Sequence, residues 1–111
     1  MRNEKETIER ILEDCKLEYE RASGMFPQFN SPHEGYAILL EEVDELWDEI
    51  KGNKKEGALE RMRKEAVQVA AMAMRFIELI DYTNDAVDDY IHSLESEYAT
   101  EYESLNNAEK F

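Results

Sequence analysis

The chain has 111 residues, with 27 acidic against 13 basic side chains and a formal net charge of −14. This length suits one domain, and the negative charge opposes binding to a nucleic-acid polymer or to an anionic membrane surface. Scarce glycine and proline, with abundant Glu and Lys, predict an all-α fold of long helices.

The amino-terminal residues Met1 to Glu6 are charged and lead into no apolar run of signal-peptide length. No stretch reaches the ~18 apolar residues that a membrane span needs. We therefore expect a cytoplasmic protein with no membrane partner. One domain is expected over residues 1–111, with its core at about 4–99 and a frayed tail at 100–111.

The first predicted helix has apolar residues at helical spacing from Ile8 to Ala22, and Ser23-Gly24 is expected to end it. Asn3, with Glu6 three residues later, resembles a capping box. The connector from Met25 to Asn30 carries two aromatic residues. These either anchor in the core or stack on a ligand.

The second predicted helix runs from Pro32 to about Lys51, because Ser31 can be its N-cap and Pro32 suits the first helical position. Glu34 stands where the acid of a capping box belongs. Residues 52–57 carry glycine at both ends and predict a polar turn.

The third predicted helix extends from about Ala58 to Asp81, and its segment 66–74 is apolar except at Gln68. A fourth is expected from Asp85 to about Tyr98, with Thr83 or Asn84 as its cap. The third helix has more apolar faces than one subunit would readily cover. We therefore expect a four-helix bundle that assembles as a dimer or a dimer of dimers.

Acidic residues border the predicted core face of the second and third helices. On a helical wheel Glu42 and Glu65 each fall about 60° from the apolar stripe of their helix. Glu45 continues along the flank of Glu42, and Gln68 lies one turn beyond Glu65. If the two helices pack antiparallel across the 52–57 turn, these flanks converge. Converging carboxylates repel one another unless a cation such as Mg²⁺ compensates. The alternative is that these acids simply lie on solvated faces.

Two segments resemble the motifs of one family. Glu41-Glu42-Val43-Asp44-Glu45 reads as the EExxE motif of the MazG-like, all-α nucleoside triphosphate pyrophosphohydrolases. Glu65-Ala66-Val67-Gln68 takes the place of the ExxD motif of that family. The resemblance spans about residues 29–80. It implies a MazG-like bundle that hydrolyses a nucleoside triphosphate between the α and β phosphates, forming a homodimer or homotetramer.

By this resemblance Glu42, Glu45 and Glu65 are expected to bind Mg²⁺, with Mn²⁺ as a possible substitute. Glu41 and Glu42 would be the catalytic residues, with Glu41 either a further ligand or the group that orients the attacking water. Gln68 departs from the motif, which usually has Asp there. Its amide either contributes one oxygen to the metal site, holds a ligand carboxylate, or is a buried polar group with a structural role.

The sequence indicates substrate-binding residues less specifically than metal ligands. Lys54 and Arg61 belong to the richest basic cluster and could neutralise phosphates, although solubilising surface charge is the plain alternative. Trp47 and Phe29 could line a pocket for the base, or pack in the core. His33 is a further candidate for a general base.

Two other functions fit the same residues. With Gln68 in the metal motif, the chain could be a catalytically weakened module for oligomerisation or nucleotide sensing. It could also be a helical bundle that docks a partner helix without any nucleotide.

Overall fold

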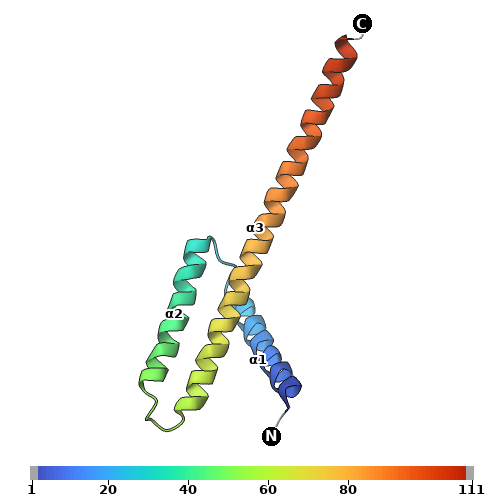
Figure 1. Ribbon diagram of the computed structural model, residues 1–111. Helices are drawn as coiled ribbons and strands as arrows, with labels where there is room; N and C mark the ends of the chain where they lie inside the picture. The colour runs from blue at the N-terminus through green and yellow to red at the C-terminus, as the bar shows by residue number, and fades with distance from the viewer. Residues whose placement is uncertain (1–2, 110–111) are drawn as a thin grey trace. The chain divides into compact units, whose positions relative to one another are not determined.

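The computed structural model describes residues 3–109, and side chains as far as Glu97. Within this range the chain forms three α-helices and no β-strand (Figure 1). Helix α1 spans Glu4–Met25, α2 spans Pro32–Lys51 and α3 spans Ala58–Glu109. The predicted all-α fold class is confirmed.

The helix starts form as the sequence indicates. Asn3 Oδ1 accepts a hydrogen bond of 2.9 Å from the backbone N–H of Glu6, which caps α1. Ser31 Oγ accepts one of 3.1 Å from the N–H of Glu34, which caps α2 ahead of Pro32. These bonds satisfy backbone donors that a helix start otherwise leaves without partners.

The helix ends differ slightly from expectation. Helix α1 passes through Ser23-Gly24 and ends at Met25, where the N–H of Phe26 bonds to the carbonyl of Ala22. Helix α2 ends at Lys51 as predicted, and a turn follows. Gly57 closes this turn with φ of +74°, in the left-handed region that glycine adopts without steric cost.

The predicted fourth helix is not separate, and this expectation was wrong. Helix α3 continues through Thr83 and Asn84 to Glu109, well past the predicted end near Tyr98. Thr and Asn cost a helix interior only a few tenths of a kcal/mol more than typical residues. Because no Gly or Pro occurs from Ala58 to Glu109, a capping residue alone does not interrupt the helix. Residues 110–111 of the predicted tail lie outside the described range.

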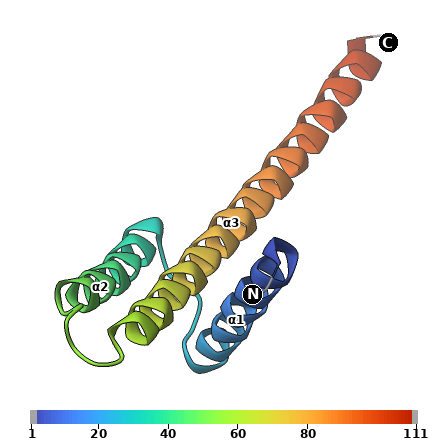
Figure 2. The same cartoon turned by 60° about the horizontal axis from the view of Figure 1, so that its bottom comes forward.

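The chain divides into two compact units, Met1–Leu79 and Ile80–Phe111. The first unit holds α1, α2 and the amino-terminal part of α3. In it, α2 and this part of α3 run antiparallel on either side of the 52–57 turn, while α1 lies along the opposite side of α3 (Figure 2). The second unit is the carboxyl-terminal part of α3. None of the described helices is long and apolar enough to cross a membrane.

A small core forms where the connector meets the helices of the first unit. Phe29 is buried against α3, so core anchoring is confirmed for this aromatic residue. The buried cluster and the side chains packed on it are Ala22, Phe29, Ala71, Met72 and Leu79, with Tyr19, Ile38, Leu39 and Phe76. The predicted apolar stripe of α2 is Leu39, Val43, Leu46 and Ile50. It is only partly covered, since Val43 is 40% exposed and Ile50 is 38% exposed.

Gly35 allows α2 to approach this core closely. A Cβ atom at position 35 would lie 2.8 Å from Cδ2 of Phe76 and 2.9 Å from Cδ2 of Phe29. We therefore expect Gly35→Ala to lower the free energy of unfolding by about 1–3 kcal/mol, the usual cost of overpacking. Urea denaturation measures this change.

Gly24 provides the matched control, because a Cβ atom there meets nothing within 4 Å. Gly24→Ala is expected to be neutral or to stabilise the chain by up to about 1 kcal/mol, since alanine favours helix. Equal effects of the two substitutions would contradict the close packing at Gly35.

Candidate metal centre

Three carboxylates from two helices meet in the first unit. Glu42 and Glu45 lie one turn apart on α2, and Glu65 faces them from α3. One oxygen from each lies within 4.8 Å of the others. The antiparallel turn at residues 52–57 produces this meeting, because it places the flanks of both helices on the same side.

Electrostatic strain at this cluster is concentrated on Glu42. Partial burial, followed by repulsion from Glu45, Glu65 and Glu18, raises the pKa of Glu42 to about 7. Burial and repulsion from Glu45 also raise the pKa of Glu65. A divalent cation would stabilise the ionised form of such crowded carboxylates, because it compensates their negative charges.

Gln68 lies between two of these carboxylates. With its amide oriented so that nitrogen faces them, Gln68 donates hydrogen bonds to Glu42 Oε2 at 2.9 Å and to Glu65 Oε2 at 3.1 Å. It therefore bridges α2 and α3 at the cluster. This geometry favours the interpretation in which Gln68 holds the ligand carboxylates.

A cavity of about 340 Å³ opens beside the cluster. Glu41, Glu42 and Gln68 are part of its lining, and Glu42 belongs to the carboxylate cluster. Its apolar wall comes from Ala22, Phe26, Pro27, Phe29, Ile38 and Met72. Its other polar groups are Glu18, Arg21, Glu34 and Arg75. Apolar walls with a few polar groups are typical of small-molecule sites.

Arg75 fixes the connector as one wall of this cavity. Its side chain is buried and donates hydrogen bonds to the carbonyls of Pro27 at 2.6 Å and Phe26 at 3.3 Å. The guanidinium also lies over the ring of Phe29, 4.7 Å from its centre. The sequence interpretation missed Arg75, although a single charge at the end of an apolar segment was a usable signal.

Helix α1 adds a charged pair at the cavity that the sequence interpretation also missed. Arg21 donates two hydrogen bonds to the carboxylate of Glu18, at 2.6 and 2.9 Å. This bond lowers the pKa of Glu18. Only the packing of α1 on α3 brings the pair near Glu42, so spacing within one helix gives no indication of it.

A second cavity, of about 380 Å³, lies on the α1 side of α3 and reaches Gln68. Its lining includes the cations Arg10, Arg63 and Lys64 and the carboxylates Asp14, Glu18 and Glu60. Arg63 donates a hydrogen bond of 2.7 Å to Asp14 on α1, which ties the two helices together. Cationic groups are thus available close to the carboxylate cluster.

No protein-family model, curated protein or solved structure matches this chain.

The structure brings some of the predicted substrate residues to the site and leaves others away from it. Phe29 lines the first cavity, as do Glu41 and Glu42. Arg61 instead bonds to Glu49 at 2.9 Å and to the carbonyl of Glu56 at 2.7 Å.

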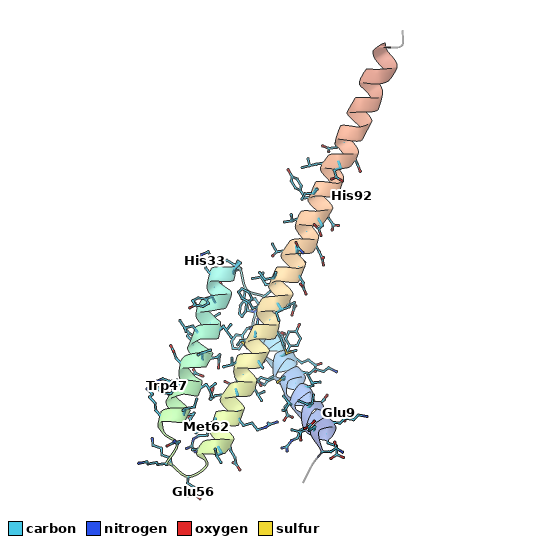
Figure 3. All side chains as sticks on the ribbon, viewed as in Figure 1. Glu9, His33, Trp47, Glu56, Met62 and His92 are labelled. Atoms are coloured by element: carbon cyan, nitrogen blue, oxygen red, sulfur yellow. The ribbon has the colours of Figure 1, made fainter. Side chains whose placement is uncertain are left out.

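The remaining candidates are exposed. Lys54 lies in the 52–57 turn, and Trp47 is 54% exposed beneath the ammonium group of Lys51. His33 is exposed in the first turn of α2, far along the helix from Trp47 (Figure 3). None of these three lines either of the cavities described above.

Chemically, the arrangement offers a cluster of carboxylate ligands beside the first cavity, and Gln68 lines both cavities. Carboxylate oxygens are the ligands that Mg²⁺ prefers, and this ion usually keeps several coordination positions for water and phosphate oxygens. The first cavity can hold an apolar or aromatic group, and the second presents three cations among three carboxylates. A phosphorylated small molecule suits this combination.

Proposed function

We propose that this chain is a Mg²⁺-dependent nucleoside triphosphate pyrophosphohydrolase, which releases a nucleoside monophosphate and pyrophosphate. The observation that supports this most is the convergence of Glu42, Glu45 and Glu65 from α2 and α3 within 4.8 Å. The motif resemblance of these same positions supports it independently.

In this proposal Glu42, Glu45 and Glu65 hold Mg²⁺, or Mn²⁺ in its place. When bound, the metal would neutralise charge on the phosphates and lower the pKa of a coordinated water. Glu41 borders the first cavity and would orient the attacking water or accept its proton. Gln68 would hold the carboxylates of Glu42 and Glu65 in position.

The nucleoside would occupy the first cavity, where Phe29 offers an aromatic wall and the volume of about 340 Å³ lies at the small end of the usual ligand pockets. The triphosphate would extend past the carboxylates toward Arg10, Arg63 and Lys64 in the second cavity. Arg10 and Lys64 replace Lys54 and Arg61 as our preferred phosphate contacts, because Lys54 lines neither cavity and Arg61 is already paired with Glu49. Arg63 would have to exchange Asp14 for a phosphate oxygen.

Assembly and location are part of the same proposal. Large apolar side chains remain exposed on the first unit, such as Leu12 at 63% and Trp47 at 54%. A homodimer or homotetramer in the cytoplasm would cover such surfaces.

The direct test is a pyrophosphate-release assay over the common nucleoside triphosphates, with Mg²⁺, with Mn²⁺ and with a chelator. We expect release from at least one nucleotide that requires the added metal. Release of inorganic phosphate instead of pyrophosphate would contradict attack between the α and β phosphates.

A catalytically weakened, nucleotide-binding module of the same fold is the second candidate, and Gln68 is the observation that favours it. With the amide nitrogen facing them, Gln68 already donates hydrogen bonds to the carboxylates of Glu42 and Glu65 without a metal. This candidate predicts nucleotide binding without turnover.

Gln68→Asp distinguishes a metal-related role of position 68 from a purely structural one. Adding a carboxylate beside Glu42 and Glu65 is expected to tighten Mg²⁺ binding by about tenfold, because one more negative charge faces the cation. Isothermal calorimetry measures the affinity.

Gln68→Asn is the matched control, since it has the shape of Asp without the charge. It is expected to bind Mg²⁺ no more tightly than the parent chain. Identical affinities for the Asp and Asn variants would assign Gln68 a purely structural role.

A further inference from the structure

The second unit, Ile80–Phe111, carries an apolar stripe along one face of α3. At about 100° per residue, Ile80, Val87, Ile91 and Leu94 fall within about 60° of one another. The spacing of seven, four and three residues is that of a coiled-coil seam. Ile80 is 40% exposed and Val87 and Ile91 are each 47% exposed, so the described part of the chain leaves this stripe uncovered.

Asn84 lies within the same stripe, one turn before Val87. A polar residue at a seam position of a coiled coil lowers stability, but it sets the register of the pairing because it demands a polar group opposite. A stripe that packs loosely against varied surfaces has no fixed register, so a polar seam residue would only lower its stability. Asn84 therefore points to a partner helix with a defined alignment.

Carboxylates lie beside and behind the stripe, and no Lys or Arg accompanies them. The segment 80–97 contains no Lys or Arg. Its acids are Asp81, Asp85, Asp88, Asp89, Glu95 and Glu97. None of them forms an ion pair within the described chain, and Asp85 has like charges four residues away on both sides, at Asp81 and Asp89. An unaccompanied helix of this kind is electrostatically unfavourable.

Three of these acids lie on one border of the stripe. Asp81, Asp88 and Glu95 are spaced by seven residues and fall about 60–100° from the stripe centre. In a two-helix coiled coil such border positions face the border of the partner, and opposite charges there determine which partner binds. A partner with Lys or Arg at that border would form an ion pair with each of the three.

We propose that this face binds an amphipathic helix of another protein, with an apolar stripe bordered by Lys or Arg. Charge complementarity selects this occupant over a second copy of the chain, which would bring six more carboxylates and no cation from the same segment. The partner helix also presents a polar side chain opposite Asn84.

A designed peptide tests this without knowledge of the natural partner. The probe is a helical peptide of about four heptads, with Ile and Leu at the seam, one Asn among them, and Lys at both borders, which prevents it from pairing with itself. One control peptide has Glu in place of every border Lys. Another keeps the Lys residues but has Ser at the seam. Binding to the 111-residue chain is measured by fluorescence anisotropy.

We expect the Lys-bordered peptide to bind, and neither control peptide to bind comparably. Ile91→Asp should weaken binding at least about tenfold, because a charge enters the seam. Tyr82→Asp is the matched control, since Tyr82 is 66% exposed on the side opposite the stripe. It adds the same charge and should change the affinity less than about twofold.

A charge-reversed chain gives a second, positive test that leaves the stripe intact. Substituting Lys for both Asp88 and Glu95 should weaken the binding of the Lys-bordered peptide and allow the Glu-bordered peptide to bind. Failure of the Lys-bordered peptide to bind the parent chain, or equal binding to Ile91→Asp, would overturn the proposal. So would a dimer of the parent chain, seen by sedimentation, that Ile91→Asp dissociates, because a second copy would then occupy the face.

Discussion

Glu42→Gln and Glu65→Gln are each expected to lower Mg²⁺-dependent pyrophosphate release by at least about 100-fold. Each substitution removes one negatively charged ligand from a cluster of three, and loss of an outer contact alone typically costs about 10–100-fold at metal sites. Steady-state kinetics at saturating nucleotide, across a Mg²⁺ titration, measures the loss and shows how much of it excess metal restores.

Asp44→Asn is the matched control for these variants, because Asp44 lies on the same helix, is exposed, and is not part of the carboxylate cluster. It removes the same charge and is expected to retain activity within about twofold.

Unfolding in urea adds a second check on the cluster variants. Without metal, Glu42→Gln should be at least as stable as the parent chain, because the substitution relieves repulsion between the carboxylates. Full activity in both cluster variants would remove these residues from the mechanism.

Mg²⁺ affinity is expected to rise with pH and to level off above about pH 7. The cause is Glu42, whose pKa is raised to about 7 by burial and by repulsion from its neighbours. A metal ligand has to be deprotonated, so protons and Mg²⁺ compete for this carboxylate. Affinity at about pH 6 should be about tenfold weaker than at about pH 8, as competition from one proton requires. Calorimetry in two buffers of different ionisation enthalpy should show the proton release directly.

The metal-free chain should show the opposite trend in stability. Since the pKa of Glu42 is raised on folding, the folded state holds a proton that the unfolded chain releases between about pH 4.5 and about pH 7. The contribution of Glu42 to stability is therefore fully present below this range and is lost as pH rises through it. Saturating Mg²⁺ should reduce this loss, whereas a Mg²⁺ affinity independent of pH would contradict competition at Glu42.

Much of the site was predictable because it depends on local patterns. Ser31 and Pro32 define the start of α2, and the glycine-bounded turn at 52–57 reverses the chain into α3. With both helices placed, their periodicity alone locates the flanks that carry Glu42 and Glu65. The convergence of these carboxylates follows from helix geometry and one short turn.

The features that sequence reasoning missed depend on contacts between distant residues or on small energies. Arg75 fixes the connector through carbonyls nearly fifty positions earlier, at Phe26 and Pro27. No helical spacing indicates such a pairing. Helix α3 is uninterrupted because Thr83 and Asn84 destabilise a helix interior only slightly. Their preference for capping positions suggested a helix boundary that these small energies do not produce.

The most direct test of the metal centre is anomalous diffraction from a crystal of the full chain soaked in Mn²⁺, which replaces Mg²⁺ and scatters anomalously. We expect a peak bonded to carboxylate oxygens of Glu42, Glu45 and Glu65 at about 2.0–2.2 Å, and no such peak in Glu65→Gln under the same conditions. A parent crystal whose Mn²⁺ peaks all lie elsewhere on this acidic surface would show that the three carboxylates do not form a metal site.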